Sequence, residues 1–86
     1  MADYTVVFAR SARKELKNLD PQVGRRVLKQ IEALVANPRP AGVVKLEGAS
    51  DLWRIRVGEW RVLYRISDGD HLVDVIAVRH RRDAYR

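Results

Sequence analysis

The chain has 86 residues, 47% hydrophobic and 33% charged, so it is long enough for one modest core and too apolar for a disordered chain. It contains no cysteine, which excludes disulfides, thiolate metal sites and cysteine nucleophiles and agrees with a reducing compartment. A net charge of +6 predicts an acidic partner, with nucleic acid first and an anionic protein second.

The first half of the chain predicts a strand followed by two helices. Residues 3–9 alternate in polarity and are rich in β-branched and aromatic types, as in a strand. Helical spacing follows from Ser11, a possible N-cap residue, and Asp20-Pro21 ends this helix and begins the next. The second helix ends at Asn37-Pro38 and has an apolar stripe of Val23, Val27, Ile31 and Leu34. Its other face is polar, with Arg25, Arg26 and Lys29 most simply in solvent.

The second half predicts three strands after a connector at residues 43–50. Residues 52–57 and 60–66 alternate in polarity, and Gly58-Glu59 between them fits a two-residue hairpin turn. Asp68-Gly69 is a second turn, and residues 71–78 form a last strand that is apolar on both sides and therefore central in the sheet. Pairing across this turn would place Tyr64 opposite Val73.

The hairpin predicts a surface with clustered positive charge. If Gly58 and Glu59 form the turn, Arg56 faces Arg61, and Arg54 lies on the same side of the sheet. Like charges directly opposite each other on a sheet are destabilising by a few tenths to about 1 kcal/mol. A polyanion bound across this face would offset that cost.

These elements predict an α+β fold in one domain that spans residues 1–86. The order is β-α-α-β-β-β, with a helical hairpin packed on one face of a mainly antiparallel four-stranded sheet. The arginine face is then left in solvent. No apolar stretch reaches the roughly 18 residues of a membrane span and no signal-peptide pattern is evident, so we expect a cytoplasmic protein without a membrane partner.

The remaining residues exclude most catalytic chemistry. The two histidines, His71 and His80, lie in no metal-binding motif, and the glycines form no phosphate-binding loop, so we predict neither a metal nor a cofactor. The arginine cluster suits RNA cleavage, because arginines bind a phosphate while the ribose 2′-hydroxyl attacks it. Arginine is a poor base at neutral pH, which leaves proton transfer to His80 or Tyr85. Lys45 and Arg81 could also reach the cluster.

Three segments together resemble the RelE branch of the RelE/ParE toxins of bacterial toxin–antitoxin modules. They are Lys45-Leu46-Glu47-Gly48, the hairpin 53–64, and Val78 to Tyr85. The resemblance covers essentially the whole chain and implies a RelE-like fold and a cognate antitoxin that forms a hetero-oligomer with the toxin and masks its basic face. It also implies a metal-independent endoribonuclease that cleaves mRNA in the ribosomal A site and contacts ribosomal RNA.

The resemblance extends to the site residues. Carried over position by position, it implies roles for Arg54, Arg56, Arg61, Arg81 and Tyr85. With His80 added as a candidate for proton transfer, the predicted catalytic set is Arg54, Arg56, Arg61, His80, Arg81 and Tyr85. The predicted RNA-binding set is Lys45, Arg54, Arg56, Arg79 and Arg82. The family often has lysines where this chain has Arg54 and Arg56, and arginine cannot readily replace a lysine that acts as base. Two alternatives stay open, a ParE-type inhibitor of DNA gyrase that is not an enzyme, and a basic module that binds RNA or an acidic partner without chemistry.

Overall fold

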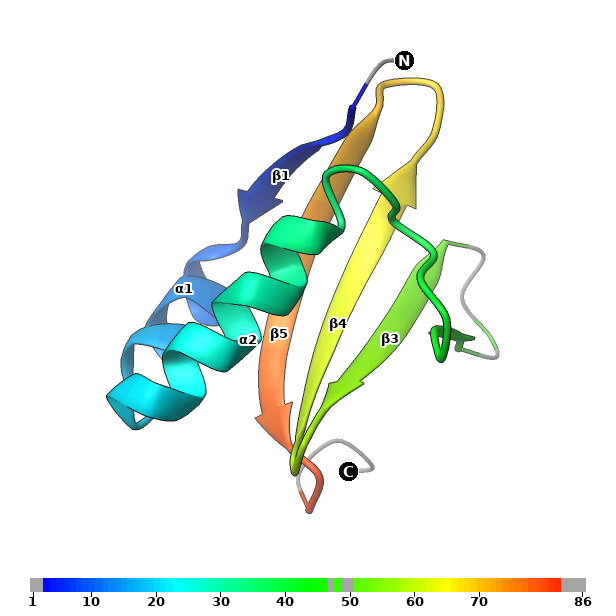
Figure 1. The fold of residues 1–86 in the computed structure, drawn as a ribbon. Coiled ribbons are helices and arrows are strands. Elements are labelled where there is room, and N and C mark those ends of the chain that lie inside the picture. The colour runs from blue at the N-terminus through cyan, green and yellow to red at the C-terminus, as the bar shows by residue number, and fades with distance from the viewer. Residues whose placement is uncertain (1–2, 47, 49–50, 83–86) are drawn as a thin grey trace.

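A computed structural model describes residues 3–46, 48 and 51–82, which form a five-stranded mixed sheet with two helices packed on it (Figure 1). In chain order the elements are β1 (Thr5–Phe8), α1 (Arg10–Lys17), α2 (Pro21–Ala33), β2 (Val44–Lys45), β3 (Leu52–Val57), β4 (Trp60–Ser67) and β5 (Leu72–His80). The strand order is β1-β5-β4-β3-β2, and only the β1–β5 pair is parallel. The predicted α+β class and the central position of the last strand are confirmed.

The number of strands differs from the prediction of four. The fifth strand is β2, which lies in the segment predicted as a connector and pairs with Trp53 and Arg54 of β3. A two-residue strand is too short for an alternating pattern, so the sequence carries no signal for it.

The two helices begin for different reasons. At α2 the prediction is confirmed, because Asp20 accepts a hydrogen bond from the backbone N–H of Gln22 at 3.0 Å and Pro21 follows it. At α1 the predicted cap is wrong. The N-cap residue is Ala9, and Ser11 lies inside the helix, where its hydroxyl donates to the carbonyl of Ile76 on β5 at 3.2 Å.

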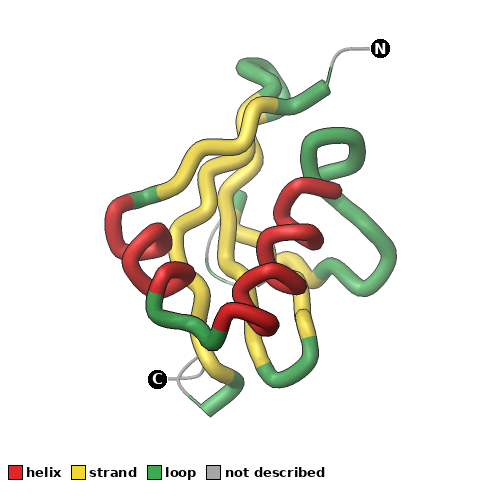
Figure 2. The backbone as a smooth tube through the Cα atoms, turned by 60° about the vertical axis from the view of Figure 1, so that its left-hand side comes forward, coloured by secondary structure: helices red, strands yellow, loops and turns green. Residues whose placement is uncertain are grey.

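The core lies between the helices and the sheet. The predicted stripe of α2 faces the strands, with Val27, Ile31 and Leu34 at most 1% exposed. It packs against strand residues that alternate onto the same face, namely Ile55, Val57, Val62, Tyr64, Ile66, Val73, Val75 and Val78. The tube view shows both helices alongside the strands that they cover (Figure 2). In the described residues, no helix is long and apolar enough to cross a membrane.

The register of β3 and β4 is the predicted one. Gly58 adopts a φ of +60° at the turn, a conformation that glycine accepts without strain. Val57 then pairs with Trp60, Arg56 with Arg61 and Arg54 with Leu63.

The predicted register of β4 and β5 is wrong. Tyr64 pairs with Val75 and not with Val73, because the turn takes in the four residues Asp68 to His71. A β-bulge at Ile76 shifts the pairing by one more residue, so Val62 pairs with Val78 and Arg61 with Arg79. Because a shift by one residue exchanges the two faces, the bulge decides which side chains of the last strand join the core.

The outer edge of β5 is covered in two parts. Strand β1 runs beside its first half and ends where Phe8 pairs with Val75. Beyond that point α1 takes over, since Ser11 bonds the carbonyl of Ile76 and the Glu15 carboxylate accepts from the backbone N–H of Val78 at 3.0 Å. Helix α1 therefore protects an edge that would otherwise be open to other strands.

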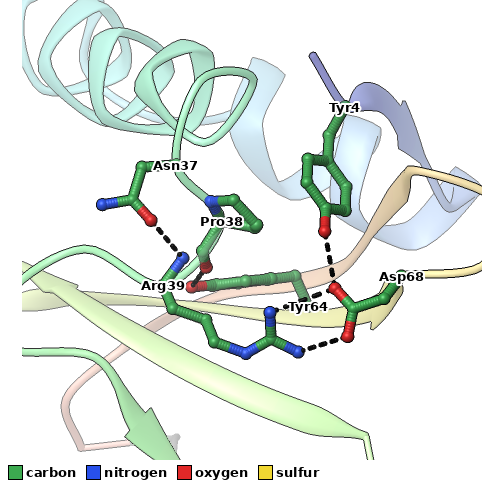
Figure 3. A network of polar contacts seen from close by, with 6 residues as sticks. All are labelled: Tyr4, Asn37, Pro38, Arg39, Tyr64 and Asp68. Carbon is green, nitrogen blue, oxygen red and sulfur yellow. Dashed lines mark hydrogen bonds and ion pairs between the residues drawn. The ribbon is translucent and has the colours of Figure 1, made fainter. Parts of the chain in front are cut away.

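A network of polar contacts closes the end of the sheet near the β4–β5 turn (Figure 3). The Asp68 carboxylate accepts from the Tyr4 hydroxyl at 2.6 Å and from both terminal nitrogens of Arg39 at 3.1 and 2.8 Å. These bonds lower the pKa of Asp68 to about 2, and the bond to Asp68 raises the pKa of Tyr4. Tyr64 donates to the carbonyl of Pro38 at 2.7 Å, and its burial raises its pKa to about 12. The loop after α2 is thereby fastened to β4 and to the turn that follows it.

Candidate functional site

Three arginines form a row across adjacent strands at the opposite end of the sheet. Arg56 of β3 pairs directly with Arg61 of β4, which pairs in turn with Arg79 of β5. Directly paired residues share a face, and all three alternate with core residues, so this face is the one turned away from the helices. We call Arg56, Arg61 and Arg79 the arginine row. Arg54 lies on the same face, two residues before Arg56.

The arginines predicted for this face differ in exposure. Arg56 is exposed and Arg54 is half-buried, whereas only 6% of Arg61 is accessible to solvent. The prediction that all three predicted arginines are open to solvent is therefore wrong for Arg61. A buried guanidinium acts through a medium of lower dielectric constant, where its charge is felt more strongly than on an open surface.

Two carboxylates at this end of the sheet pair with arginines, one of them in the arginine row. Glu15 of α1 accepts from Nε of Arg79 at 2.7 Å while it also holds the edge of β5. Glu59, in the turn, lies 3.4 Å from Nε of Arg81, and its carbonyl accepts from the Arg81 backbone N–H at 2.8 Å. Sequence reasoning missed the role of Glu15, because the chain shows only a glutamate on a helix and no pattern that aims it at a strand edge.

His80 lies on the opposite side of the sheet from the arginine row. It is the last residue of β5 and pairs with Trp60, whose side chain packs on the core, and the two rings meet edge to face with centroids 5.2 Å apart. Its Nδ1 accepts from the backbone N–H of Arg82 at 3.3 Å. We expected the chain after Val78 to carry this histidine to the arginine face, and this expectation is wrong. Strand β5 continues to His80, and the bulge at Ile76 shifts its alternation by one residue, so the His80 side chain points to the side of the sheet that the helices cover.

The other predicted site residues are distributed around the sheet. Lys45 pairs with Trp53 of β3, with its ammonium 5.8 Å from the centre of the indole ring, so it lies on the helix side and does not join the row. Arg81 and Arg82 follow the end of β5 and are exposed. Tyr85 lies outside the described residues.

The site has the chemistry of anion binding. Guanidinium groups offer several N–H donors and a permanent positive charge, which suit phosphate oxygens. In the described part of the chain, no group of three histidine, cysteine, aspartate or glutamate residues is placed to hold a metal ion. The guanidinium groups of this face can therefore bind an anion and stabilise negative charge.

Comparisons with known proteins agree on one family. Residues 6–85 match the model of the ParE toxin of the type II toxin–antitoxin system parDE. Toxin RelG of Mycobacterium tuberculosis is 33% identical over 84 residues, which are 96% of this chain and 97% of that protein.

Solved structures give the same result. The archaeal RelE–RelB complex from Pyrococcus horikoshii contains a chain that superposes with a TM-score of 0.83 and 31% identity, over 98% of this chain and 100% of that one. The RelBE toxin–antitoxin complex of Escherichia coli contains a chain with a TM-score of 0.76 and 29% identity, over 87% and 93% of the two chains.

Proposed function

We propose, from the premise that this chain belongs to the RelE/ParE family of toxins of type II toxin–antitoxin systems, that it is an endoribonuclease that cleaves mRNA on the ribosome. The reaction is attack of a ribose 2′-hydroxyl on the neighbouring phosphate, with release of the 5′-oxygen. This mechanism requires neither a metal ion nor a protein nucleophile.

The arginine row is the observation that carries the proposal. Arg56 and Arg61 lie directly opposite each other on strands that are about 4.8 Å apart, and like charges in this position repel one another. An anion bound across them would relieve this repulsion. A phosphate bound there is held through Arg56, while the charge of Arg61 stabilises the negative charge that develops on its nonbridging oxygens. Arg54 and Arg81 extend the contact along the RNA backbone, and Arg79 and Arg82 add positive charge at the end of β5.

Proton transfer is assigned to Tyr85. His80 packs against Trp60 on the helix side of the sheet, which disfavours it as the base for a phosphate on the arginine row. Tyr85 is the remaining candidate, and to act as the base it would need positive charge to lower the pKa of its phenol toward the working pH. Tyr85→Phe is expected to abolish the acidic limb of the pH–rate profile, which reports deprotonation of the base, and His80→Gln is expected to retain this limb.

The proposed partner is a cognate antitoxin. Two of the solved relatives are complexes of RelE with RelB, so a small antitoxin that covers the basic face fits this chain as well. Such a complex would hide the arginine row from RNA. Activity is then expected only from toxin freed of its antitoxin.

The test is primer extension on mRNA after induction of the chain in cells. We expect cleavage that requires translation, and its loss in Arg61→Ala and Arg81→Ala variants that remain folded by circular dichroism. Cleavage that persists in both variants would refute a catalytic role for this face.

A second function is kept because the matching family model is that of ParE. A ParE-type protein would inhibit DNA gyrase by binding and would not act as an enzyme. Growth arrest with intact mRNA and trapped gyrase would support this function. Salt-dependent RNA binding with no cleavage product would instead support a basic binding module.

A further inference from the structure

A second basic feature lies where α2 passes the open end of β3. A hollow of about 290 Å³ is lined there by Arg26, Lys29 and Gln30 of α2 and by Arg56, Val57 and Gly58 at the end of β3. The three α2 residues lie three and four positions apart, so they share one face of the helix. Strand β2 pairs only with Trp53 and Arg54, so among the described residues no strand lies beside Arg56 on this side.

The hollow is positively charged, and the described residues that line it include no carboxylate. Arg26, Lys29 and Arg56 contribute three positive charges. A Cβ added at Gly58 would lie 3.6 Å from Nη2 of Arg26, so this guanidinium is directed at the turn and not away into solvent. Three like charges around one hollow raise the local positive potential and attract an anion.

These cations differ from three arginines that are held by ion pairs elsewhere in the described residues. Arg39, Arg79 and Arg81 each form an ion pair with a carboxylate, at 2.8, 2.7 and 3.4 Å. In the part of the chain that the structure describes, no ion pair is formed by Arg26, Lys29 or Arg56. Their charge is therefore available to a ligand without breaking an internal bond.

The hollow is continuous with the arginine row. Arg56 lines the hollow and also pairs with Arg61 in the row, so it joins the two basic surfaces around the edge of the sheet. An anion with repeated charges could cross from one to the other. A polyphosphate backbone has this property, and a single small anion does not.

We propose that the hollow between α2 and the end of β3 binds a phosphodiester group of the RNA strand whose neighbouring phosphates lie on the arginine row. The inference rests on the proposed function for the identity of the ligand. Arg26 and Lys29 contact the RNA backbone away from the reacting phosphate, so they are binding residues and not catalytic ones. Gln30 offers an uncharged donor at the same place.

The experiment compares two double variants of the full chain with equal loss of charge. Arg26→Gln with Lys29→Gln removes the hollow's charge on α2, and Arg25→Gln with Lys17→Gln removes two exposed charges that do not line it. The probe is a short single-stranded RNA with 2′-O-methyl riboses, which cannot be cleaved by 2′-hydroxyl attack. Binding is measured over a range of salt concentrations, and cleavage of ribosome-bound mRNA is measured separately.

We expect the slope of log affinity against log salt to fall in magnitude by about 0.7 in the hollow variant, the amount for the one phosphate that the protein no longer neutralises. The control variant should keep the parent slope. For cleavage, the hollow variant should have a raised KM and an unchanged rate at saturation, because the reacting phosphate is still held by the row.

The remaining outcomes separate this inference from the proposed function. If the parent chain binds RNA but never cleaves it, and the slopes still differ, the proposed function fails and the phosphate site stands. Equal slopes in the two double variants would overturn the phosphate site even if cleavage is normal. Loss of antitoxin binding with unchanged RNA affinity would also overturn it, since the hollow would then hold an acidic peptide.

Discussion

The two ends of β4 use arginine in different ways. At the Ser67 end, Arg39 forms two hydrogen bonds to Asp68, which is also bonded by Tyr4, so the cation is neutralised within the fold. At the Trp60 end, Arg56, Arg61 and Arg79 stand in a row, Glu15 pairs with Arg79, and Glu59 pairs with Arg81 just beyond it. We call these the closed end and the basic end.

The difference indicates which charges serve stability and which serve binding. Arg39 bonds Asp68 through both of its terminal nitrogens, so it holds two segments of chain together and has few donors left for a ligand. An excess of positive charge destabilises the fold locally, and this cost is offset when an anion binds. An arginine can therefore be assigned to stability or to binding according to the number of carboxylates that surround it.

The largest expected effect comes from neutralising one arginine at each end. Arg61→Gln at the basic end should lower the single-turnover rate of mRNA cleavage by about 100- to 1000-fold, the usual effect of removing one group that stabilises developing charge. Arg39→Gln at the closed end should leave this rate unchanged. Equal losses in the two folded variants, checked by near-ultraviolet circular dichroism, would remove the distinction between the ends.

The second effect concerns the stability of the closed end. Tyr64 is fully buried and donates to the carbonyl of Pro38, so Tyr64→Phe leaves that carbonyl without its donor. We expect the free energy of unfolding to fall by about 1–3 kcal/mol in urea denaturation. RNA affinity should not change, and a variant that loses RNA affinity while still folded would contradict the separation.

The third effect tests the carboxylate that links the helix to the basic end. Glu15→Gln removes the negative charge beside Arg79 but keeps an oxygen for the backbone N–H of Val78. The free energy of unfolding should fall by less than about 1 kcal/mol, because the ion pair is partly exposed. Affinity for the 2′-O-methyl RNA should rise, since Arg79 is released toward the ligand. A fall in RNA affinity would show that Glu15 positions Arg79 for binding.

The smallest effect is a pH dependence at the closed end. The pKa of Asp68 is about 2 in the folded protein and ordinarily 3.8, so its bonds stabilise the fold fully above the ordinary value. This stabilisation is lost as the pH falls from 3.8 toward 2. The Tm of the parent chain should therefore fall more steeply than that of Asp68→Asn over this interval. Parallel curves of Tm against pH would contradict the assignment.

Most of the fold follows from local patterns in the sequence. The stripe of α2, the Asp20-Pro21 boundary and the Gly58-Glu59 turn each depend on residues close together in the chain, and all three are confirmed. The β4–β5 register depends on a four-residue turn and on a bulge, which have no comparable local signal. The predicted turn had two residues instead of four, so every predicted pair between β4 and β5 was out of register by at least two residues.

The site was predictable only where the hairpin register was correct. Arg54, Arg56 and Arg61 were placed on one face because the two-residue turn fixes their positions. Arg79 and His80 depend on the last strand, so the error in its register reached them as well. The spacing of Arg26 and Lys29 was visible on α2, but nothing in the chain indicated that this helix face meets the end of β3.

The bulge at Ile76 has a consequence for genetic change in this chain. It offsets the alternation of β5 by one position, so that Val78 enters the core and Arg79 joins the arginine row. Deletion of one codon here would restore a regular strand and exchange these two residues, driving a charged group inward and a valine outward. Point substitutions along β5 leave this alternation intact, so the strand should tolerate substituted residues far better than a changed length.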